Sequence, residues 1–172
     1  MPARQMDLLA NTSENKFIKN YLKGGTNMEH IIKDFNKIKD IDLIMKIWLN
    51  SNLQAHDFIS DRYWIENYDE VKKLLPQSHL RVYWKDEQPI GFIGIVDGYI
   101  AGIFVDSNYR CQGIGLALLE DAKKQYNKLS LDVYEKNQGA FRFYKRNGFQ
   151  KVSSKVDDIN KEIEYHMIWK KK

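Results

Sequence analysis

A strand-to-helix turn built around two glycines constrains the fold of this chain more than any other feature. The apolar run 100–105 predicts a buried strand, and residues 115–126 carry apolar side chains at helical spacing. Between them, Gly113 and Gly115 let the backbone approach a ligand closely, and the first N–H groups of the helix have no partner inside it. These donors, the helix dipole and the neighbouring Arg110 favour an anion, most naturally a phosphate.

Two common phosphate loops do not fit this turn. The dinucleotide fingerprint needs a third glycine three residues after the second, where this chain has Leu118. The nucleotide P-loop needs Gly-Lys-Ser/Thr, but Gly115 is followed by Leu116 and Ala117. On these residues alone, a plain turn with a helix cap remains an alternative interpretation.

A second segment carries a further signature. Residues 131–137 predict a strand that ends at Asn137, followed by a short helix with Tyr144 and then Asn147-Gly148-Phe149. Gly148 stands where a left-handed helix C-cap requires glycine.

The two segments resemble the two signatures of the GCN5-related N-acetyltransferase (GNAT) family, in the family's order and at a similar separation. The spacing Arg-x-x-Gly-x-Gly is similar to the family's coenzyme A pyrophosphate loop. The resemblance covers residues 28–172 and implies an α/β GNAT fold. That fold has a mixed, mostly antiparallel sheet of six to seven strands, splayed central parallel strands and about four helices.

Within the family the chain most resembles a bacterial subgroup, some of whose members are described as peptidyl-lysine N-acetyltransferases. The resemblance rests on a His-x-Phe-Ile motif followed by Tyr-Trp, which here are His56, Phe58, Ile59, Tyr63 and Trp64.

The remaining elements alternate between strand and helix. Asp97-Gly98 is a strong hairpin signal, Asp40 is a candidate cap for the first helix, and Pro76 ends the second. The predicted strands are 31–35, 80–84, 90–96, 99–105, 129–134, 149–156 and 162–169, and the predicted helices are 41–50, 61–75, 115–126 and 139–146. The inner face of the first helix is predicted to carry Leu43, Ile44, Ile47 and Trp48.

Residues 1–27 are polar and differ from the rest of the chain. They could contain a short helix between Ser13 and Gly24, and Met28 looks like a natural start. We expect the extension to come from an upstream start codon or a cloning remnant rather than an added docking helix, and residues 28–172 to form one domain.

Composition excludes several classes of protein. The net charge of +4 and pI near 9.0 suit an anionic cofactor but are too diffuse to predict nucleic-acid binding. The single cysteine, Cys111, excludes an internal disulfide framework, and Cys and His are too few and scattered to predict a metal site. No apolar run approaches the roughly 18 residues of a membrane span. We expect a cytoplasmic protein without a membrane partner, as a monomer or homodimer.

The resemblance implies that acetyl-CoA binds as co-substrate. Its pantetheine arm would lie against backbone groups of the central strand and form a hydrogen bond with Asn137, and its pyrophosphate would lie on the glycine turn. The implied cofactor-binding residues are Ile103, Phe104, Val105, Arg110, Cys111, Gln112, Gly113, Ile114, Gly115, Leu116, Asn137 and Tyr144.

Tyr144 is the candidate general acid, because the family places a tyrosine here within reach of the thioester sulfur. A phenol of pKa about 10 can donate to a thiolate of pKa about 8.5 with a small uphill step. The alternative is a half-buried tyrosine on an amphipathic helix.

The general base is less defined. A lysine amine of pKa about 10.4 is almost fully protonated at neutral pH, so a group must remove its proton. Many family members place a glutamate on the central strand where this chain has Ala101. His56 and Glu135 are the candidate substitutes, acting directly or through water, and a loop or capping role for His56 is the alternative. Five aromatic residues could line the acceptor side or pack in the core: Phe58, Tyr63, Trp64, Tyr83 and Trp84.

The sequence thus predicts an N-acetyltransferase that moves an acetyl group from acetyl-CoA to a primary amine by direct transfer in a ternary complex. Protein lysine or an N-terminal amine is the expected acceptor. A small-molecule amine such as a polyamine or aminoglycoside is an alternative, as is a non-catalytic acyl-CoA-binding regulatory module.

Overall fold

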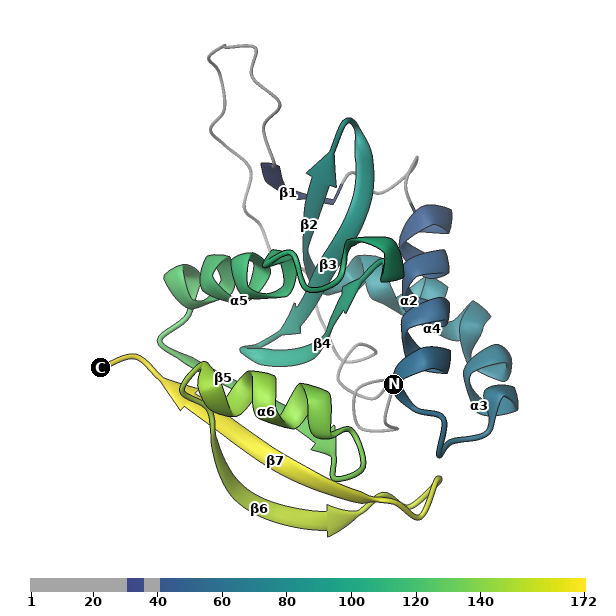
Figure 1. Cartoon of the computed structure of the whole chain (residues 1–172), viewed down its shortest axis with the longest axis vertical. Helices are drawn as coiled ribbons and strands as arrows, with labels where there is room; N and C mark the ends of the chain where they lie inside the picture. The colour runs from purple at the N-terminus through teal and green to yellow at the C-terminus, as the bar shows by residue number, and fades with distance from the viewer. Residues whose placement is uncertain (1–30, 36–40) are drawn as a thin grey trace.

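One seven-stranded sheet organises the fold. The structure, a computed structural model, describes residues 31–35 and 41–172. The strand order is β1-β2-β3-β4-β5-β7-β6 (Figure 1). Neighbouring strands are antiparallel except β4 and β5, which are parallel. The strands are β1 (Ile31–Asp34), β2 (His79–Lys85), β3 (Gln88–Val96), β4 (Tyr99–Val105), β5 (Lys128–Tyr134), β6 (Gln150–Val156) and β7 (Ile163–Lys170).

Helices cover both faces of this sheet and bury two separate cores. Along β3 the side chains alternate, so that Phe92 packs in the core under the first three helices and Ile93 packs in the core under the last two. The first group is α2 (Ile41–Ala55), α3 (Asp61–Glu66) and α4 (Tyr68–Leu74), and the second is α5 (Ile114–Gln125) and α6 (Gln138–Arg146) (Figure 1). None of these helices is long and apolar enough to cross a membrane.

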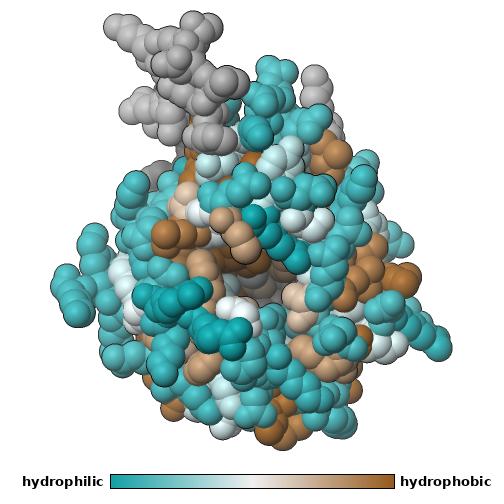
Figure 2. All heavy atoms as spheres, viewed as in Figure 1, coloured by the Kyte–Doolittle hydropathy of each residue, from teal (hydrophilic) through white to brown (hydrophobic). Residues whose placement is uncertain are grey.

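The sheet is interrupted at its centre, where β4 and β5 diverge. The two parallel strands share a single paired position, Tyr99 with Ser130, beside a hydrogen bond of 2.9 Å from the N–H of Ser130 to the carbonyl of Gly98. Beyond this point the strands separate, and the surface between α5 and α6 is hollowed and lined by apolar atoms (Figure 2).

A β-bulge distorts β4 close to the point of divergence. The register with β3 shifts by one residue, because Gly94 pairs with Gly102 whereas Ile95 pairs with Ile100. Ala101 is therefore the extra residue, and such a bulge bends the strand and re-aims its side chains.

The fold predicted from the sequence is confirmed, including the Asp97-Gly98 hairpin and the central parallel pair. The first helix continues past its predicted end at Asn50 to Ala55. The predicted helix 61–75 is two helices, because Asn67 ends α3 and its side-chain amide donates to the Tyr63 carbonyl at 2.6 Å. Within residues 31–35 and 41–172, five α-helices therefore stand where about four were expected.

One predicted core position is wrong. Leu43 is 47% exposed, whereas Ile44, Ile47 and Trp48 are buried as expected. The predicted Asp40 cap and the predictions for residues 1–27 lie outside the described residues.

Replacing Trp48 by alanine should lower the free energy of unfolding by about 3–5 kcal/mol, because the indole is fully buried against Trp64 and Tyr68. Urea unfolding followed by circular dichroism measures the change. Leu43→Ala on the same helix is the matched control and should stay within about 0.5 kcal/mol of the parent. Equal effects of the two substitutions would contradict the assigned helix face.

Candidate active site

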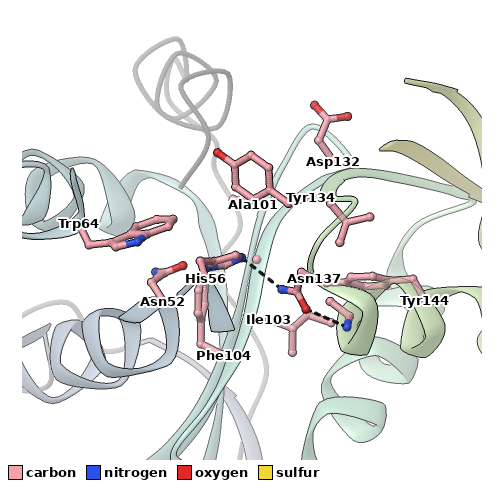
Figure 3. A pocket seen from close by; sticks show the side chains of 13 residues that line it. Asn52, His56, Trp64, Ala101, Ile103, Phe104, Asp132, Tyr134, Asn137 and Tyr144 are labelled. Atoms are coloured by element: carbon pink, nitrogen blue, oxygen red, sulfur yellow. Dashed lines mark hydrogen bonds between the residues drawn. The ribbon is translucent and has the colours of Figure 1, made fainter. Parts of the chain in front are cut away.

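A pocket lies in the cleft between β4 and β5 and draws side chains from both layers of helices. His56 and Trp64 enter from the α2–α3 side, and Asn137 and Tyr144 enter from α6 (Figure 3). The lining residues are Asn52, His56, Trp64, Ala101, Gly102, Ile103, Phe104, Asp132, Val133, Tyr134, Asn137, Ala140 and Tyr144.

The edge of β4 that faces the cleft carries backbone groups without a neighbouring strand. On its other edge, β4 is paired with β3 as far as Val105. Alternate residues therefore turn their N–H and C=O groups towards the cleft, where an extended ligand with amide groups can pair with them. Val105 differs, because its carbonyl already accepts from Ser51 Oγ and from Arg110 Nε, each at 3.3 Å.

The glycine turn leaves the first N–H groups of α5 free of a side-chain cap. Gly113 is the N-cap with φ of +82°, and Cys111 also has a positive φ of +60°. The first backbone bond of the helix joins the N–H of Ala117 to the carbonyl of Gly113 at 2.9 Å. A Cβ on Gly113 would meet nothing within 4 Å, so the position requires glycine for its backbone angle rather than for space. A helix end of this kind, with free N–H groups and no side-chain cap, favours an anion.

Asn137 connects α6 to the far wall of the cleft. Its side-chain oxygen accepts from the Ala140 N–H at 3.1 Å and so caps the helix. Its Nδ2 lies 3.2 Å from His56 Nε2. Because an amide nitrogen only donates, Nε2 of His56 must be the acceptor, which assigns the ring proton to Nδ1. The second N–H of the Asn137 amide is not needed for this contact.

His56 is held as a neutral ring inside an aromatic cage. It stacks on Trp64 with ring centres 5.1 Å apart and meets the edges of Phe58 and Tyr134 at 5.7 and 5.6 Å. Burial disfavours the charged form and lowers the pKa of His56 to about 4. The ring is therefore uncharged at neutral pH.

Tyr144 lies on the opposite side of the pocket and is buried on α6. Its ring packs against Phe143 and Phe149 at 5.2 and 5.4 Å between centres. Burial raises the pKa of Tyr144 well above 10, so the phenol enters the pocket as an O–H donor.

The structure places some of the other sequence-predicted candidates in the pocket and others outside it. Glu135 accepts from the Tyr165 hydroxyl and does not line the pocket. Of the five candidate aromatics, Trp64 lines the pocket, with Phe58 and Tyr63 packed beside it. The remaining two, Tyr83 and Trp84, lie on β2 and pack against different cores.

Sequence reasoning missed Tyr134. Its hydroxyl donates to Asp157 Oδ2 at 3.1 Å and accepts from Asn160 Nδ2 at 3.2 Å. This contact ties the pocket to the loop between β6 and β7, and only the alternation of side chains along β5 could have indicated it. No group of three or more His, Cys, Asp or Glu side chains in the described ranges could hold a metal ion.

Comparisons with known proteins agree with this geometry. The profile of the Acetyltransferase (GNAT) family matches residues 41–149. The chain is 35% identical over 120 residues to the peptidyl-lysine N-acetyltransferase YjaB of Escherichia coli. The aligned region covers 69% of this chain and 82% of YjaB. It is 31% identical over 132 residues to the peptidyl-lysine N-acetyltransferase YiaC of the same organism, covering 76% and 90%.

Solved structures give the same fold. The solution structure of apo YjaB from Escherichia coli has a TM-score of 0.74 at 28% identity and covers 84% of this chain and all of that one. The PaiA N-acetyltransferase from Thermoplasma acidophilum, crystallised with coenzyme A, has a TM-score of 0.70 at 22% identity, covering 83% and 99%.

The buried neutral state of His56 should appear in the pH dependence of stability. Since the folded pKa is about 4 and the unfolded value about 6.5, the unfolded chain takes a proton that the folded chain refuses. The free energy of unfolding should fall below pH 6.5, by about 2 kcal/mol at pH 5 from this ring alone. Urea midpoints of the parent and His56→Phe between pH 7 and 5 test this.

The His56→Phe variant should lose less stability over that range than the parent. Leu43→Ala, an exposed position on α2 that carries no titratable group, is the control and should follow the parent curve. Parallel curves for the parent and His56→Phe would contradict the buried neutral ring.

Proposed function

The chain belongs to the GNAT family of acetyltransferases, and from this premise we propose that it transfers the acetyl group of acetyl-CoA directly to a primary amine. The expected acceptor is a protein lysine or an N-terminal amine, and both substrates are bound together when transfer occurs. The observation that carries the proposal is the separation of β4 and β5. The cleft that results lies between the uncapped N-terminus of α5 and the pocket in which His56 contacts Asn137.

Acetyl-CoA fits the groups that this cleft presents. Its pyrophosphate matches the free N–H groups of α5 and the guanidinium of Arg110. Its two amides match the unpaired edge of β4 at residues 103–105, apart from the Val105 carbonyl, which already accepts from Ser51 and Arg110. The second N–H of Asn137 is available to the arm. We assign the turn residues 110–116 to the contact with the pyrophosphate. Acetyl-CoA supplies an activated acyl thioester, and the protein's part is to hold it and to direct protons.

We assign Tyr144 the role of proton donor to the leaving thiolate. Its raised pKa keeps the proton on the phenol until the thiolate forms, although the transfer is then more uphill than from a phenol of pKa 10. The hydroxyl also offers a hydrogen bond to the sulfur as charge develops on it.

His56 is assigned to the amine side. The Nε2 lone pair can take the amine's proton only when the Asn137 amide turns its N–H away from it. With a pKa of about 4 the ring cannot retain a proton from an ammonium of pKa about 10.4, so it passes the proton on to water. The contact with Asn137 fixes the orientation of the ring, and Trp64 limits its rotation.

A second function has one observation in its favour. Ala101 provides no carboxylate beside the cleft, and its side chain is buried on the bulge of β4. A non-catalytic module that binds acyl-CoA and regulates a partner needs no base there. The two functions differ in whether any amine is acetylated.

Mass-spectrometric detection of acetyl transfer to a panel of lysine peptides, free N-termini, polyamines and aminoglycosides tests the proposal. Tyr144→Phe should lower kcat by about 10²–10⁴-fold and leave acetyl-CoA affinity unchanged, because the hydroxyl acts on the leaving group. Tyr126→Phe, whose hydroxyl contacts His79 outside the pocket, is the control and should retain full activity.

Acetyl-CoA binding without any acetylated product in the panel would favour the regulatory module. Full turnover by Tyr144→Phe would refute the assigned acid while leaving acetyl transfer intact.

Gly113→Ala should raise the Kd for acetyl-CoA by about tenfold, since a Cβ disfavours φ of +82° and the loop must relax away from the binding geometry. Calorimetric titration measures the affinity. Gly148→Ala provides the matched control, because φ there is +86° but the residue lies in the turn after α6. That variant should lose stability with unchanged affinity, and equal affinity losses in both would remove the loop from the cofactor site.

A further inference from the structure

Three buried carboxylates lie beside the pocket on the face of the sheet that carries α2 and α3. Asp132 is 7% exposed, Asp157 is 4% exposed, and Glu164 is fully buried. Glu164 is the cross-strand partner of Tyr134, so their side chains share one face of the sheet. Asp132 and Tyr134 both line the pocket (Figure 3). This acidic cluster therefore continues from the cleft.

The three carboxylates differ in the hydrogen-bond donors that surround them. Asp157 accepts from the Tyr134 hydroxyl, and Asp132 accepts from Tyr99 at 3.2 Å and contacts His166 Nδ1 at 2.6 Å. Glu164 is different, because no neutral donor among the described residues reaches its oxygens. A buried carboxylate without hydrogen bonds is unfavourable unless a cation compensates it.

Lys155 provides that cation from the edge of the sheet. Its Nζ lies 3.3 Å from Glu164 Oε2 and 4.0 Å from Asp132 Oδ2. The lysine side chain is 45% exposed, whereas the side chains of both carboxylates are fully buried. The ammonium group thus reaches inwards from an edge strand, and its partly exposed side chain can turn out to solvent when another cation takes its place beside Glu164.

We propose that Asp132 and Glu164 form the subsite that receives the acceptor's ammonium group, and that a lysine side chain of the acceptor displaces Lys155 from it. The inference rests on the proposed acetyl transfer and names its substrate class. The exchange replaces one cation by another, so the buried carboxylates never lose their compensating charge.

The geometry favours a lysine over an N-terminal amine. The protein's own lysine spans the distance from a solvent-exposed edge to the two carboxylates, and an acceptor lysine has the same four methylenes. An α-amine is attached directly to the peptide backbone, which would have to enter the buried cluster itself. Burial raises the pKa of Glu164 to about 7, and an arriving ammonium favours its ionised form.

Calorimetric titration of the CoA-loaded protein with an Nα-acetylated lysine peptide tests the subsite without requiring turnover. Glu164→Gln should weaken peptide binding about tenfold or more, because a buried charge pair is lost. Lys155→Met should tighten it about three- to tenfold, because a competing internal cation is removed. The tightening is diagnostic, since a purely structural ion pair predicts no gain.

Two substitutions nearby serve as matched controls. Glu162→Gln removes a carboxylate that pairs with Lys136 next to the same hairpin, and Lys151→Met removes another lysine of β6. Both should bind the peptide as the parent does. A peptide with norleucine in place of lysine should not bind.

Unchanged affinity in Glu164→Gln, weaker binding in Lys155→Met, or no lysine-peptide binding by the parent would each overturn the subsite. If thermal unfolding shows that Glu164→Gln is not folded, the binding by Lys155→Met alone decides.

The acetyl-transfer assay separates the two proposals. A parent that binds the lysine peptide but acetylates no amine refutes acetyl transfer and retains the subsite, whereas acetylation confined to α-amines, with no effect of Glu164→Gln, refutes the subsite alone.

Discussion

The parting of two parallel strands after a single paired position is the constraint on which the rest of this structure depends. Because β4 and β5 meet only at Tyr99 and Ser130, the sheet has an opening in its middle rather than at its edge. Helices on both faces then border the same opening, α5 and α6 from one side and the α2–α3 segment from the other (Figure 1). The bulge at Ala101 lies beside that opening, and a bulge of this kind bends the strand that carries it.

The walls of the opening are joined by polar side chains that each serve two purposes. Asn137 caps α6 and fixes the tautomer of His56 across the cleft. Tyr134 closes one side of the histidine cage and holds the β6–β7 loop through Asp157. The cap of α6 is thereby coupled to the orientation of the His56 ring, and the β6–β7 loop is coupled to the position of Tyr134.

The sequence predicted most of the fold because its signals were local. The Asp97-Gly98 hairpin, the glycine turn before α5 and the Gly148 stop each depend on backbone angles that few residues adopt, and all three lie in the left-handed region. The exposure of Leu43 was missed because helical periodicity fixes spacing but not rotation, which is decided by the sheet beneath. The cluster around Glu164 was invisible for a similar reason, since strand register brings β5, β6 and β7 together and no pattern along the chain reveals that register.

The unpaired edge of β4 also has a consequence for the lifetime of the protein. A ligand bound in the cleft as proposed would take the place of the missing strand between β4 and β5, and it would bind the folded chain but not the unfolded one. At a ligand concentration one hundred times Kd, this linkage adds about 2.7 kcal/mol to the free energy of unfolding. The abundance of such a protein in a cell under proteolytic turnover would then follow the supply of its own substrate, so that the metabolic state sets the amount of enzyme as well as its rate.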